Sequence, residues 1–499
     1  MKLLTENNRK WWILAAMSLM LFMTNLDVSI VNLALPVIAH SLNSNLSQLQ
    51  WVITGYILTT VMFMILGGKL GDVYGHRRIF LFGAMIFTIA SVTAGFAYNE
   101  PMLIISRLMQ GIGGAFAFPL TGVISFAAFP KEQKGLALGA MATNIGVAQA
   151  IGPTLGGIIL KYLSWHWIFF INLPIGIITI LLTLLVCPKY ILRTHKEVID
   201  YKGTTLLIAS LFFILFSLNE AQNWGLSSLL FLSCFLIGIA LLIIFVVVEL
   251  KLAHPLMEIK IFLNKKFTII NIVRAVITYI YLTILFVLVL YLQNIIGINP
   301  LTTGLLLLFM TVAFGVMSPI SGKLIDRFGA YVPMLISLLI LTIIIFMFAE
   351  LTVVTSFYML AFMLLVSGIV FAVLLTATNI VALSVVPEQQ IGVASSVFFT
   401  IGIGGGMLGV AISGTIMALL SKSYLINQLI LHNINIAQAK MPLLIKVANG
   451  SHSITKIGNN LVPIVQQSFL HAFHWVMLVC TMLAFVSLVL MLFAKKKRV

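Results

Sequence analysis

The amino-acid sequence predicts an all-α polytopic membrane protein with fourteen transmembrane helices. Of its 499 residues, 61% are hydrophobic and only 8% are charged, and the mean hydropathy is +1.14. This composition excludes an ordinary soluble protein. Apolar runs of roughly 18 residues or more recur along the whole chain, and each is long enough to cross a bilayer as a helix.

The predicted helices follow one another through short loops, except at two places. A charged link occupies residues 188–202, and a long region, residues 421–469, joins the last two helices. This second region has apolar residues at helical spacing, so we expect it to lie on the membrane surface or to cap the outer mouth of the protein. The predicted spans are 11–39, 48–70, 79–98, 101–127, 135–160, 167–187, 203–220, 227–250, 267–293, 301–322, 332–350, 354–385, 391–420 and 470–494.

The net charge of +16 follows the topology of a membrane protein and does not indicate a nucleic-acid partner. Most of the 29 Lys and Arg residues fall in the two termini and the even-numbered loops, and two, Arg107 and Arg274, fall within spans. Because cytoplasmic loops are enriched in Lys and Arg, we expect both termini on the cytoplasmic side of the inner (cytoplasmic) membrane, with residues 495–499 as a basic tail against anionic lipid. The cations on the other side are Lys161, Lys422, Lys440, Lys446 and Lys456.

The cysteines and the first helix bear on cofactors and targeting. Cys187, Cys234 and Cys480 lie in apolar segments or at their ends, and no loop carries a pair. We therefore expect no disulfide framework, no metal site and no cofactor. The first apolar run lacks a small-residue cleavage site, so we expect a retained span rather than a signal peptide.

An internal repeat predicts two related halves. Residues 68–75 read GKLGDVYG and residues 322–329 read GKLIDRFG, so both fit the pattern G-K-L-x-D-x-x-G at the cytoplasmic end of a helix. Eight predicted spans separate the two copies, whereas two directly joined six-helix halves would place six between them, so the seventh and eighth spans form an inserted pair. The expected division is a six-helix bundle in residues 1–187, a link with the inserted pair in 188–266, a second six-helix bundle in 267–494 that includes the outer loop 421–469, and the tail 495–499.

Several motifs together resemble one known family. They are LDVSIVNLALP (26–36), GKLGDVYGHRR (68–78), SRLMQGIGGA (106–115), GVAQAIGPTLGG (146–157) and WHWIFFINLPIG (165–176). With these motifs the whole chain is similar to the fourteen-helix drug:proton antiporter family of the major facilitator superfamily, the multidrug or quaternary-ammonium efflux pump type. The resemblance implies two pseudo-symmetric six-helix bundles that move substrate by alternating access. The chain departs from the family pattern at Val73 and His166, where a basic residue is usual, and at Thr400–Ile401, where a polar or basic one is common.

Asp27 is the first candidate for the proton site. A carboxylate within a span costs about 3 kcal/mol at a helix centre and usually lines a pathway. At 1.5 Å per residue, Asp27 lies roughly 24 Å above the cytoplasmic edge and Arg107 roughly 9 Å below the outer edge, so the two reach similar depth, and the resemblance makes their helices neighbours. If Arg107 moves away Asp27 can take up a proton, and the return of Arg107 expels it. The alternative is a static buried pair that locks helix packing.

The loop motif is a candidate cytoplasmic gate. Asp72 lies at a helix end with Arg77 and Arg78 nearby, and Gly68 and Gly75 allow a neighbouring helix to approach. The alternative is a solvated cluster that only sets topology. The second copy, Gly322, Asp326, Arg327 and Gly329, has no equivalent of the two arginines and is the weaker candidate.

Two glycine-rich helices have packing roles in this interpretation. Gly146, Gly152, Pro153, Gly156 and Gly157 permit close contacts and bending in the fifth span, as a hinge would require. The glycine run of residues 402–409 follows no strand and lacks the spacing of a nucleotide-binding loop. We therefore expect an ion gradient, and not a nucleotide, to supply the energy.

The remaining candidates concern the substrate cavity. Asn32 and Gln110 are candidate cavity residues, and Arg274 either faces the cavity or extends back to the headgroups. From the ninth span onward the only acids are Asp326, Glu350 and Glu388, all at helix ends or in loops, so Asp27 is the only acid expected deep in the cavity. This favours monocationic, zwitterionic or neutral amphiphiles, against adaptable Phe- and Met-rich walls.

We therefore expect a proton-coupled antiporter that exports lipophilic drugs or toxic compounds. One alternative is a dedicated exporter of a metabolite, siderophore or lipid, and another is a non-transporting membrane sensor or assembly factor on a transporter fold. The chain shows no constellation of catalytic residues, so an enzyme is not expected. The expected partners are a small lipophilic substrate, protons and the bilayer, and the outer loop is a candidate docking site for an accessory protein.

Overall fold

The computed structural model describes residues 6–42, 51–188, 200–225, 227–252, 255–257, 259–298, 300–387, 390–432, 441–448 and 461–493, and within these residues all regular structure is helical. Thirteen of the described helices are long and apolar enough to cross a membrane, and α6 adds a further helix of 29 residues. The prediction of an all-helical polytopic membrane protein is confirmed. The principal helices are α1 (Glu6–Ser41), α3 (Trp51–Tyr74), α4 (His76–Gly95), α5 (Glu100–Ala128), α6 (Lys134–Tyr162), α7 (Trp167–Phe170), α8 (Asn172–Val186), α9 (Tyr201–Trp224), α10 (Leu229–Glu249), α11 (Lys265–Leu290), α12 (Pro300–Phe328), α13 (Tyr331–Ala349), α14 (Phe357–Ser384), α15 (Ile391–Leu431), α16 (Met441–Ala448) and α17 (Val462–Phe493).

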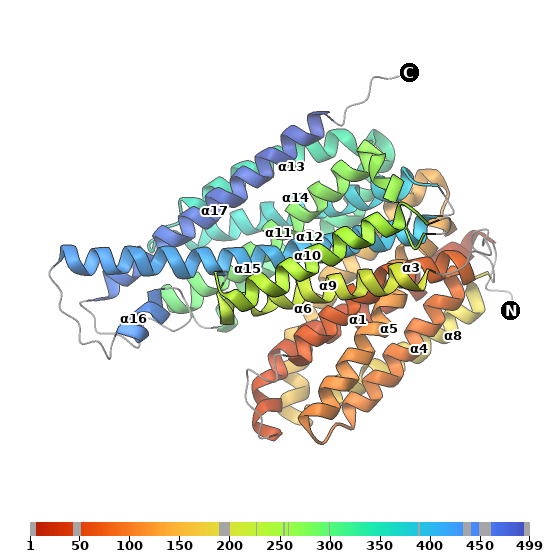
Figure 1. Ribbon diagram of the computed structural model, residues 1–499, viewed down its shortest axis with the longest axis horizontal. Coiled ribbons are helices and arrows are strands. Elements are labelled where there is room, and N and C mark those ends of the chain that lie inside the picture. The colour runs from red at the N-terminus through yellow and green to blue at the C-terminus, as the bar shows by residue number, and fades with distance from the viewer. Residues whose placement is uncertain are drawn as a thin grey trace.

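The long helices form two groups. Helices α1 and α3–α8 pack on one another, and helices α11–α15 and α17 pack on one another (Figure 1). The two groups meet along two seams, one between α6 and α12 and the other between α3 and α15. In Figure 1 they lie close together at the end where α3 ends and separate toward the end that carries α16. We call the first end, which holds Asp72 and Asp326, the motif end.

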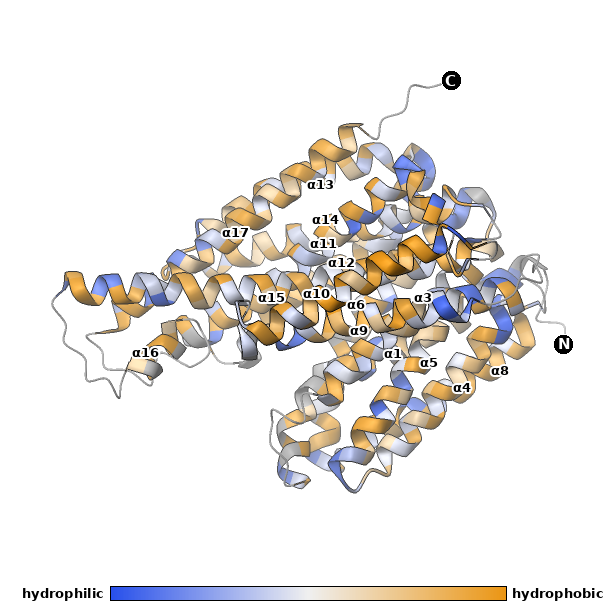
Figure 2. Ribbon diagram, in the orientation of Figure 1, coloured by the Kyte–Doolittle hydropathy of each residue, from blue (hydrophilic) through white to orange (hydrophobic). Residues whose placement is uncertain are grey.

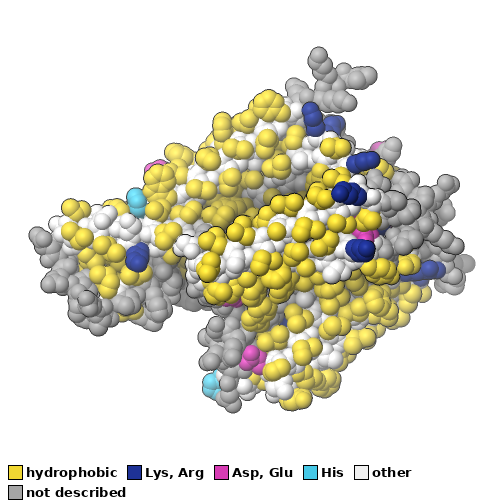
Figure 3. Space-filling view, in the orientation of Figure 1, with side chains coloured by type: hydrophobic (Ala, Val, Ile, Leu, Met, Phe, Trp, Pro, Cys, Tyr) yellow, Lys and Arg dark blue, Asp and Glu magenta, His cyan; other side chains and the backbone are white. Residues whose placement is uncertain are grey.

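The surface agrees with a position in a bilayer. Hydrophobic residues cover the length of most helices in Figure 2, and apolar side chains cover most of the visible face in Figure 3. Most Lys and Arg side chains visible on that face gather near the motif end. A lipid-facing surface needs no polar cover, because the acyl chains are as apolar as the side chains they touch.

Local signals in the sequence fix several helix starts. The side chain of Asn99 accepts a hydrogen bond from the Met102 amide at 2.9 Å and so caps α5, and Ser228 and Ser356 cap α10 and α14 in the same way. Such side chains satisfy amides that have no partner within the helix. The last glycine of each repeat copy has a positive φ, 101° at Gly75 and 76° at Gly329. Glycine is the residue that adopts this conformation without strain, which explains why both copies end in it.

The inserted pair packs on one side of the molecule only. Helix α9 contacts both α3 and α15, and α10 packs on α9 (Figure 1). The pair therefore covers the α3–α15 seam, and most of α10 is left for contact with lipid.

The long region of residues 421–469 differs from the prediction. Helix α15 continues to Leu431 instead of ending at residue 420, and α17 begins at Val462 instead of residue 470. Leu425 and Leu429 pack against α16 and the start of α17 in a small apolar cluster. This cluster buries the apolar face of α15 beyond residue 420 and so stabilises the helix past the end of the predicted span. Residues 433–440 and 449–460 of this region lie outside the described residues.

Candidate functional site

Asp27 lies at the centre of a buried polar network in the first helical group. Its side chain is 1% exposed. The Oδ2 atom accepts a hydrogen bond from Nη1 of Arg107 at 2.5 Å, and Oδ1 accepts from Nε2 of Gln110 and Nδ2 of Asn172, each at 3.0 Å. Three donors from α5 and α8 thus converge on one carboxylate of α1, which offsets the cost of burying its charge.

Arg107 is fully buried and joins three helices. Its Nε donates to the carbonyl oxygen of Val52 at 2.8 Å, and its Nη1 also donates to Oε1 of Gln110 at 2.6 Å. The guanidinium lies 4.4 Å from the ring centroid of Tyr56, a cation–π contact from α3. Helix α3 can come so close because residue 111 of α5 is a glycine. A Cβ atom at Gly111 would lie only 2.0 Å from Oγ1 of Thr59 and would push α3 away.

Asn172 is a member of the network that sequence reasoning missed. Besides its bond to Asp27, its Nδ2 donates to Oγ of Ser91 at 3.0 Å, and Ser91 donates to the carbonyl oxygen of Phe169 at 2.9 Å. The signal that could have found it is its position in the WHWIFFINLPIG motif, where a single amide interrupts an apolar run. Gln110, expected in the cavity, belongs to the network instead. It lies three residues after Arg107 and so shares the helix face that points to α1.

The first loop motif joins the two groups at the motif end. The two carboxylate oxygens of Asp72 accept hydrogen bonds from the amides of Gly392 and Val393, both at 2.9 Å, at the N-terminus of α15. Nε2 of His76 lies 2.8 Å from Oδ1 of the same carboxylate. A Cβ atom at Gly68 would lie 2.3 Å from the carbonyl oxygen of Gly392, so glycine is required for this approach. The carboxylate thus caps the positive end of a helix from the opposite group.

The second motif repeats this contact with the groups exchanged. Asp326 accepts from the amide of Gly135 at 2.8 Å and from that of Leu136 at 3.0 Å, at the N-terminus of α6. A Cβ atom at Gly322 would lie 2.0 Å from the carbonyl oxygen of Gly135. The second copy is therefore as complete as the first, although the sequence ranked it lower. We call the two carboxylate caps together the paired caps.

Arg77 and Arg327 are placed differently from the expected charge network. Nη2 of Arg77 donates to the carbonyl oxygen of Leu184 at 2.8 Å, within its own helical group, and Arg327 lies over the ring of Phe328 at 5.2 Å. The described partners of Asp72 are instead the backbone amides of α15 and His76. Backbone amides are fixed in direction, so the cap depends on helix position and not on long, mobile side chains.

A central cavity of about 240 Å³ lies between the two groups. Its lining comes from α1, α5 and α6 of the first group and from α11, α12, α14 and α15 of the second. Asp27 is not part of the lining, although we expected it to be the deep acid of this cavity. From α1, Leu21 and Asn25 reach the cavity, whereas Asp27 points into its own group, toward α5 and α8. The side chains of Asn32 and Pro153 lie outside the described residues.

Arg274 was expected either to face the cavity or to extend back to the headgroups, and it lines this cavity. Its guanidinium lies 4.8 Å from the ring centroid of Phe398 and 5.9 Å from that of Phe399. A Cβ atom at Gly402 would lie 2.9 Å from its Nε, so this glycine provides the space for the side chain. Arg274 faces the cavity and does not extend to the headgroups.

A second hollow, of about 530 Å³, continues from the central cavity away from the motif end. Leu282 lines both. The hollow is walled by α1, α3, α9, α11 and α15, with Trp51 and Asn219 near the ends of their helices. The two spaces therefore lie in series, and the paired caps close the opposite end.

The glycines of α6 divide their contacts between the two groups. A Cβ atom at Gly146 would lie 3.1 Å from the Phe314 ring of α12, and one at Gly152 would lie 2.3 Å from Oγ of Ser29 of α1. Gly156 is buried, and a Cβ at Gly157 would meet nothing within 4 Å. In α15, the glycine run packs against α11: a Cβ at Gly405 would lie 2.4 Å from the Ala275 carbonyl oxygen. Both runs are helix-packing surfaces.

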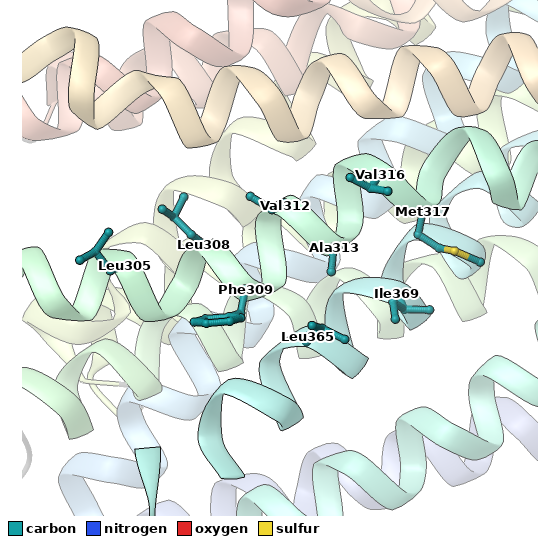
Figure 4. A pocket seen from close by; sticks show the side chains of 9 residues that line it. All are labelled: Leu305, Leu308, Phe309, Val312, Ala313, Val316, Met317, Leu365 and Ile369. Atoms are coloured by element: carbon teal, nitrogen blue, oxygen red, sulfur yellow. The ribbon is translucent and has the colours of Figure 1, made fainter. Parts of the chain in front are cut away.

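A further groove lies on the side of the molecule. It measures about 650 Å³ and is lined by apolar side chains of α12 and α14, among them Phe309 and Leu365 (Figure 4). None of its nine lining residues is charged. A groove of this composition has no group that could orient a polar substrate.

Comparisons with known proteins agree on one family. The family model described as Major Facilitator Superfamily matches residues 17–259 and 270–431. The chain is 32% identical to the riboflavin transporter RibZ of Clostridioides difficile (strain 630), over 79% of this chain and 85% of that protein. It is 31% identical to the multidrug resistance protein Stp of Mycobacterium tuberculosis (strain CDC 1551 / Oshkosh), over 81% and 75%. The crystal structure of the human organic anion transporter MFSD10 (TETRAN) matches with a TM-score of 0.62 and 12% identity, over 96% of this chain and 100% of that one, which shows the shared fold.

Proposed function

The chain belongs to the major facilitator superfamily, and from that premise we propose that it is a proton-coupled antiporter that exports lipophilic compounds across the cytoplasmic membrane by alternating access, with both termini in the cytoplasm. The observation that carries this proposal is the buried network of Asp27, Arg107, Gln110 and Asn172. A carboxylate so deep in a membrane helix is a group that a proton pathway requires. The similarity to a protein named for multidrug resistance supports export.

In this proposal the proton acts on helix packing. Protonation of Asp27 would remove the negative charge that holds Arg107 and would leave a buried guanidinium without its counter-ion. The network joins α1 to α5 and α8, so loss of the ion pair loosens these contacts. Asn25, on the same helix as Asp27, lines the central cavity. Rotation or displacement of α1 therefore changes the cavity when Asp27 changes charge, and proton and substrate occupy separate places.

In this proposal the paired caps control whether the motif end is closed or open. An anionic group at a helix N-terminus stabilises by about 0.3–1 kcal/mol, and by up to about 2 kcal/mol when partly buried. Two such caps hold the motif end closed while the hollow at the opposite end is present. To admit substrate from the cytoplasm, both caps must break. Their modest strength is suited to a contact that forms and breaks in every cycle.

Asp27→Asn is the variant that tests the proposal. The purified protein would be reconstituted in liposomes with a pH-sensitive dye in the lumen, and lipophilic compounds of several classes would be added. We expect the variant to insert and fold but to give no substrate-dependent proton movement. Glu350→Gln is the matched control, because Glu350 lies exposed at the end of α13. Normal coupled proton movement in Asp27→Asn would contradict the assignment.

A dedicated exporter of one metabolite is the second candidate. The observation that favours it is the 32% identity to a protein named as a riboflavin transporter. The same liposomes distinguish the two functions: a dedicated exporter moves protons with one compound of the panel, whereas a multidrug exporter does so with several unrelated ones.

A further inference from the structure

Three buried polar atoms without partners meet at the central cavity. They are Nε of Arg274, Oγ1 of Thr376 and Oδ1 of Asn379, and all three residues line the cavity. They come from two helices, α11 and α14, of the second group. A buried polar group without a hydrogen bond costs about 1–3 kcal/mol, so folded proteins leave few of them. Three at one cavity indicate a place where a bound molecule supplies the missing partners.

The charge of the cavity is set by Arg274. Of the twenty described residues that line it, Arg274 is the only charged one and none is acidic. Among the described residues no carboxylate pairs with Arg274, and its described close contacts are the rings of Phe398 and Phe399. Asp27 is already engaged by three donors in the first group. The cavity therefore presents one unpaired positive charge.

A guanidinium at this position favours one class of ligand. A buried cation without a counter-ion is unfavourable, and a carboxylate or another planar anion can bind the guanidinium through two parallel hydrogen bonds. A monocationic ligand would meet repulsion at short range in a medium of low dielectric constant. The charge of the cavity thus disfavours monocations and favours compounds with an acidic group.

The rest of the cavity lining indicates the chemical character of the ligand beyond its acidic group. Phe118, Phe314, Phe399 and Tyr281 contribute aromatic walls from four helices. Aromatic side chains pack well against ring systems through offset stacking or edge contacts. Asn379 presents a carbonyl oxygen that accepts a hydrogen bond, and Thr376 presents a hydroxyl that can donate or accept.

We propose that the central cavity binds aromatic compounds that carry one ionised acidic group, with the acidic group on Arg274 and a neighbouring polar group on Thr376 and Asn379. This inference rests on the proposed function and narrows its substrate class. A zwitterion satisfies it when its anionic end reaches Arg274. Gly402 belongs to the same arrangement, because a side chain there would displace the guanidinium.

The test is equilibrium binding and requires no transport. The full chain in lipid nanodiscs would be titrated by calorimetry with 1-naphthoate, with the ring-matched cation 1-naphthylmethylammonium, and with decanoate as an aliphatic acid. We expect naphthoate to bind more tightly than both other probes. Arg274→Gln should weaken naphthoate by roughly 10- to 100-fold, the range for hydrogen bonds to a charged group. Arg274→Lys keeps the charge but loses the two parallel hydrogen bonds of the guanidinium, so it should weaken naphthoate binding less than Arg274→Gln does.

Two further variants keep the test valid if Arg274→Gln fails to fold. Thr376→Val and Asn379→Ala leave the charge in place and should each weaken naphthoate by roughly 3- to 10-fold. The inference is overturned if 1-naphthylmethylammonium binds the unaltered chain as tightly as naphthoate, if decanoate binds in place of naphthoate, or if all variants that fold bind naphthoate unchanged. Because Asp27 is outside the cavity, Asp27→Asn should still bind naphthoate, so failure of proton coupling and failure of this inference give different results.

Discussion

Removal of the paired caps should open the motif end, and the geometry gives the size of the effect. Asp72 and Asp326 each accept two backbone hydrogen bonds, of 2.8–3.0 Å, at a helix N-terminus of the opposite group. Loss of an aspartate cap costs typically about 1 kcal/mol. Two independent losses amount to about 2 kcal/mol, which shifts the equilibrium between closed and open motif ends roughly 30-fold, since 1.4 kcal/mol is tenfold.

Distances across the motif end would measure this shift. Tyr74 and Phe328 are exposed there on opposite groups, and spin labels at cysteines in their place would report separation by double electron–electron resonance in a background with the three native cysteines replaced. We expect Asp72→Ala and Asp326→Ala each to populate a longer distance, and the double variant to populate it most.

Asp200→Ala is the matched control for the cap experiment. Asp200 caps α9 through the amides of Lys202 and Gly203, with the same chemistry, but it joins no helices of opposite groups. It should lower stability by a similar amount and leave the labelled distance unchanged. If Asp326→Ala has no effect while Asp72→Ala opens the motif end, the symmetric account of the caps is wrong.

Three further predictions concern single sites. Asn172→Ala removes a donor to Asp27 and should lower the free energy of unfolding by roughly 1–3 kcal/mol, measured by chemical denaturation. Gly322→Ala would place a methyl group 2.0 Å from a backbone oxygen of α6 and should keep the motif end open, whereas Gly157→Ala, with nothing within 4 Å, should be neutral in the same distance measurement. Burial raises the pKa of the Cys187 thiol to about 11, so its alkylation by iodoacetamide, followed by mass spectrometry, should be slow at pH 7 and increase as the pH rises.

The helical membrane fold could be predicted from the sequence because the apolar runs are long and recur many times. Apolar runs predicted the helices. The repeated G-K-L-x-D-x-x-G motif predicted two related halves and an inserted pair, and this division of the chain stays a prediction. The contact of Asp27 with Arg107 could be anticipated because the rise of an α-helix converts sequence separation into depth. Their role in proton coupling stays a prediction.

The direction in which Asp27 points could not be derived from the sequence. Helix α1 is buried on several sides, because the consecutive residues Ala16, Met17 and Ser18 are all buried, and so its sequence has no apolar stripe to set its rotation. The sequence therefore could not separate the cavity position of Asn25 from the internal position of Asp27.

The hydrogen-bond partners of Asp72 and Asp326 could not be predicted from the sequence for a different reason. Backbone amides of Gly392 and Gly135 carry no sequence signature. Nearby arginines looked like the natural partners of Asp72, and only the packing of α15 on α3 shows that a helix N-terminus takes that place.

Helix α9 makes the two seams between the helical groups unlike each other. Helix α9 covers the α3–α15 seam and walls the second hollow on that side, whereas neither α9 nor α10 packs on the seam between α6 and α12. In the transport cycle proposed above, a compound that left sideways would meet α9 at one seam and no inserted helix at the other.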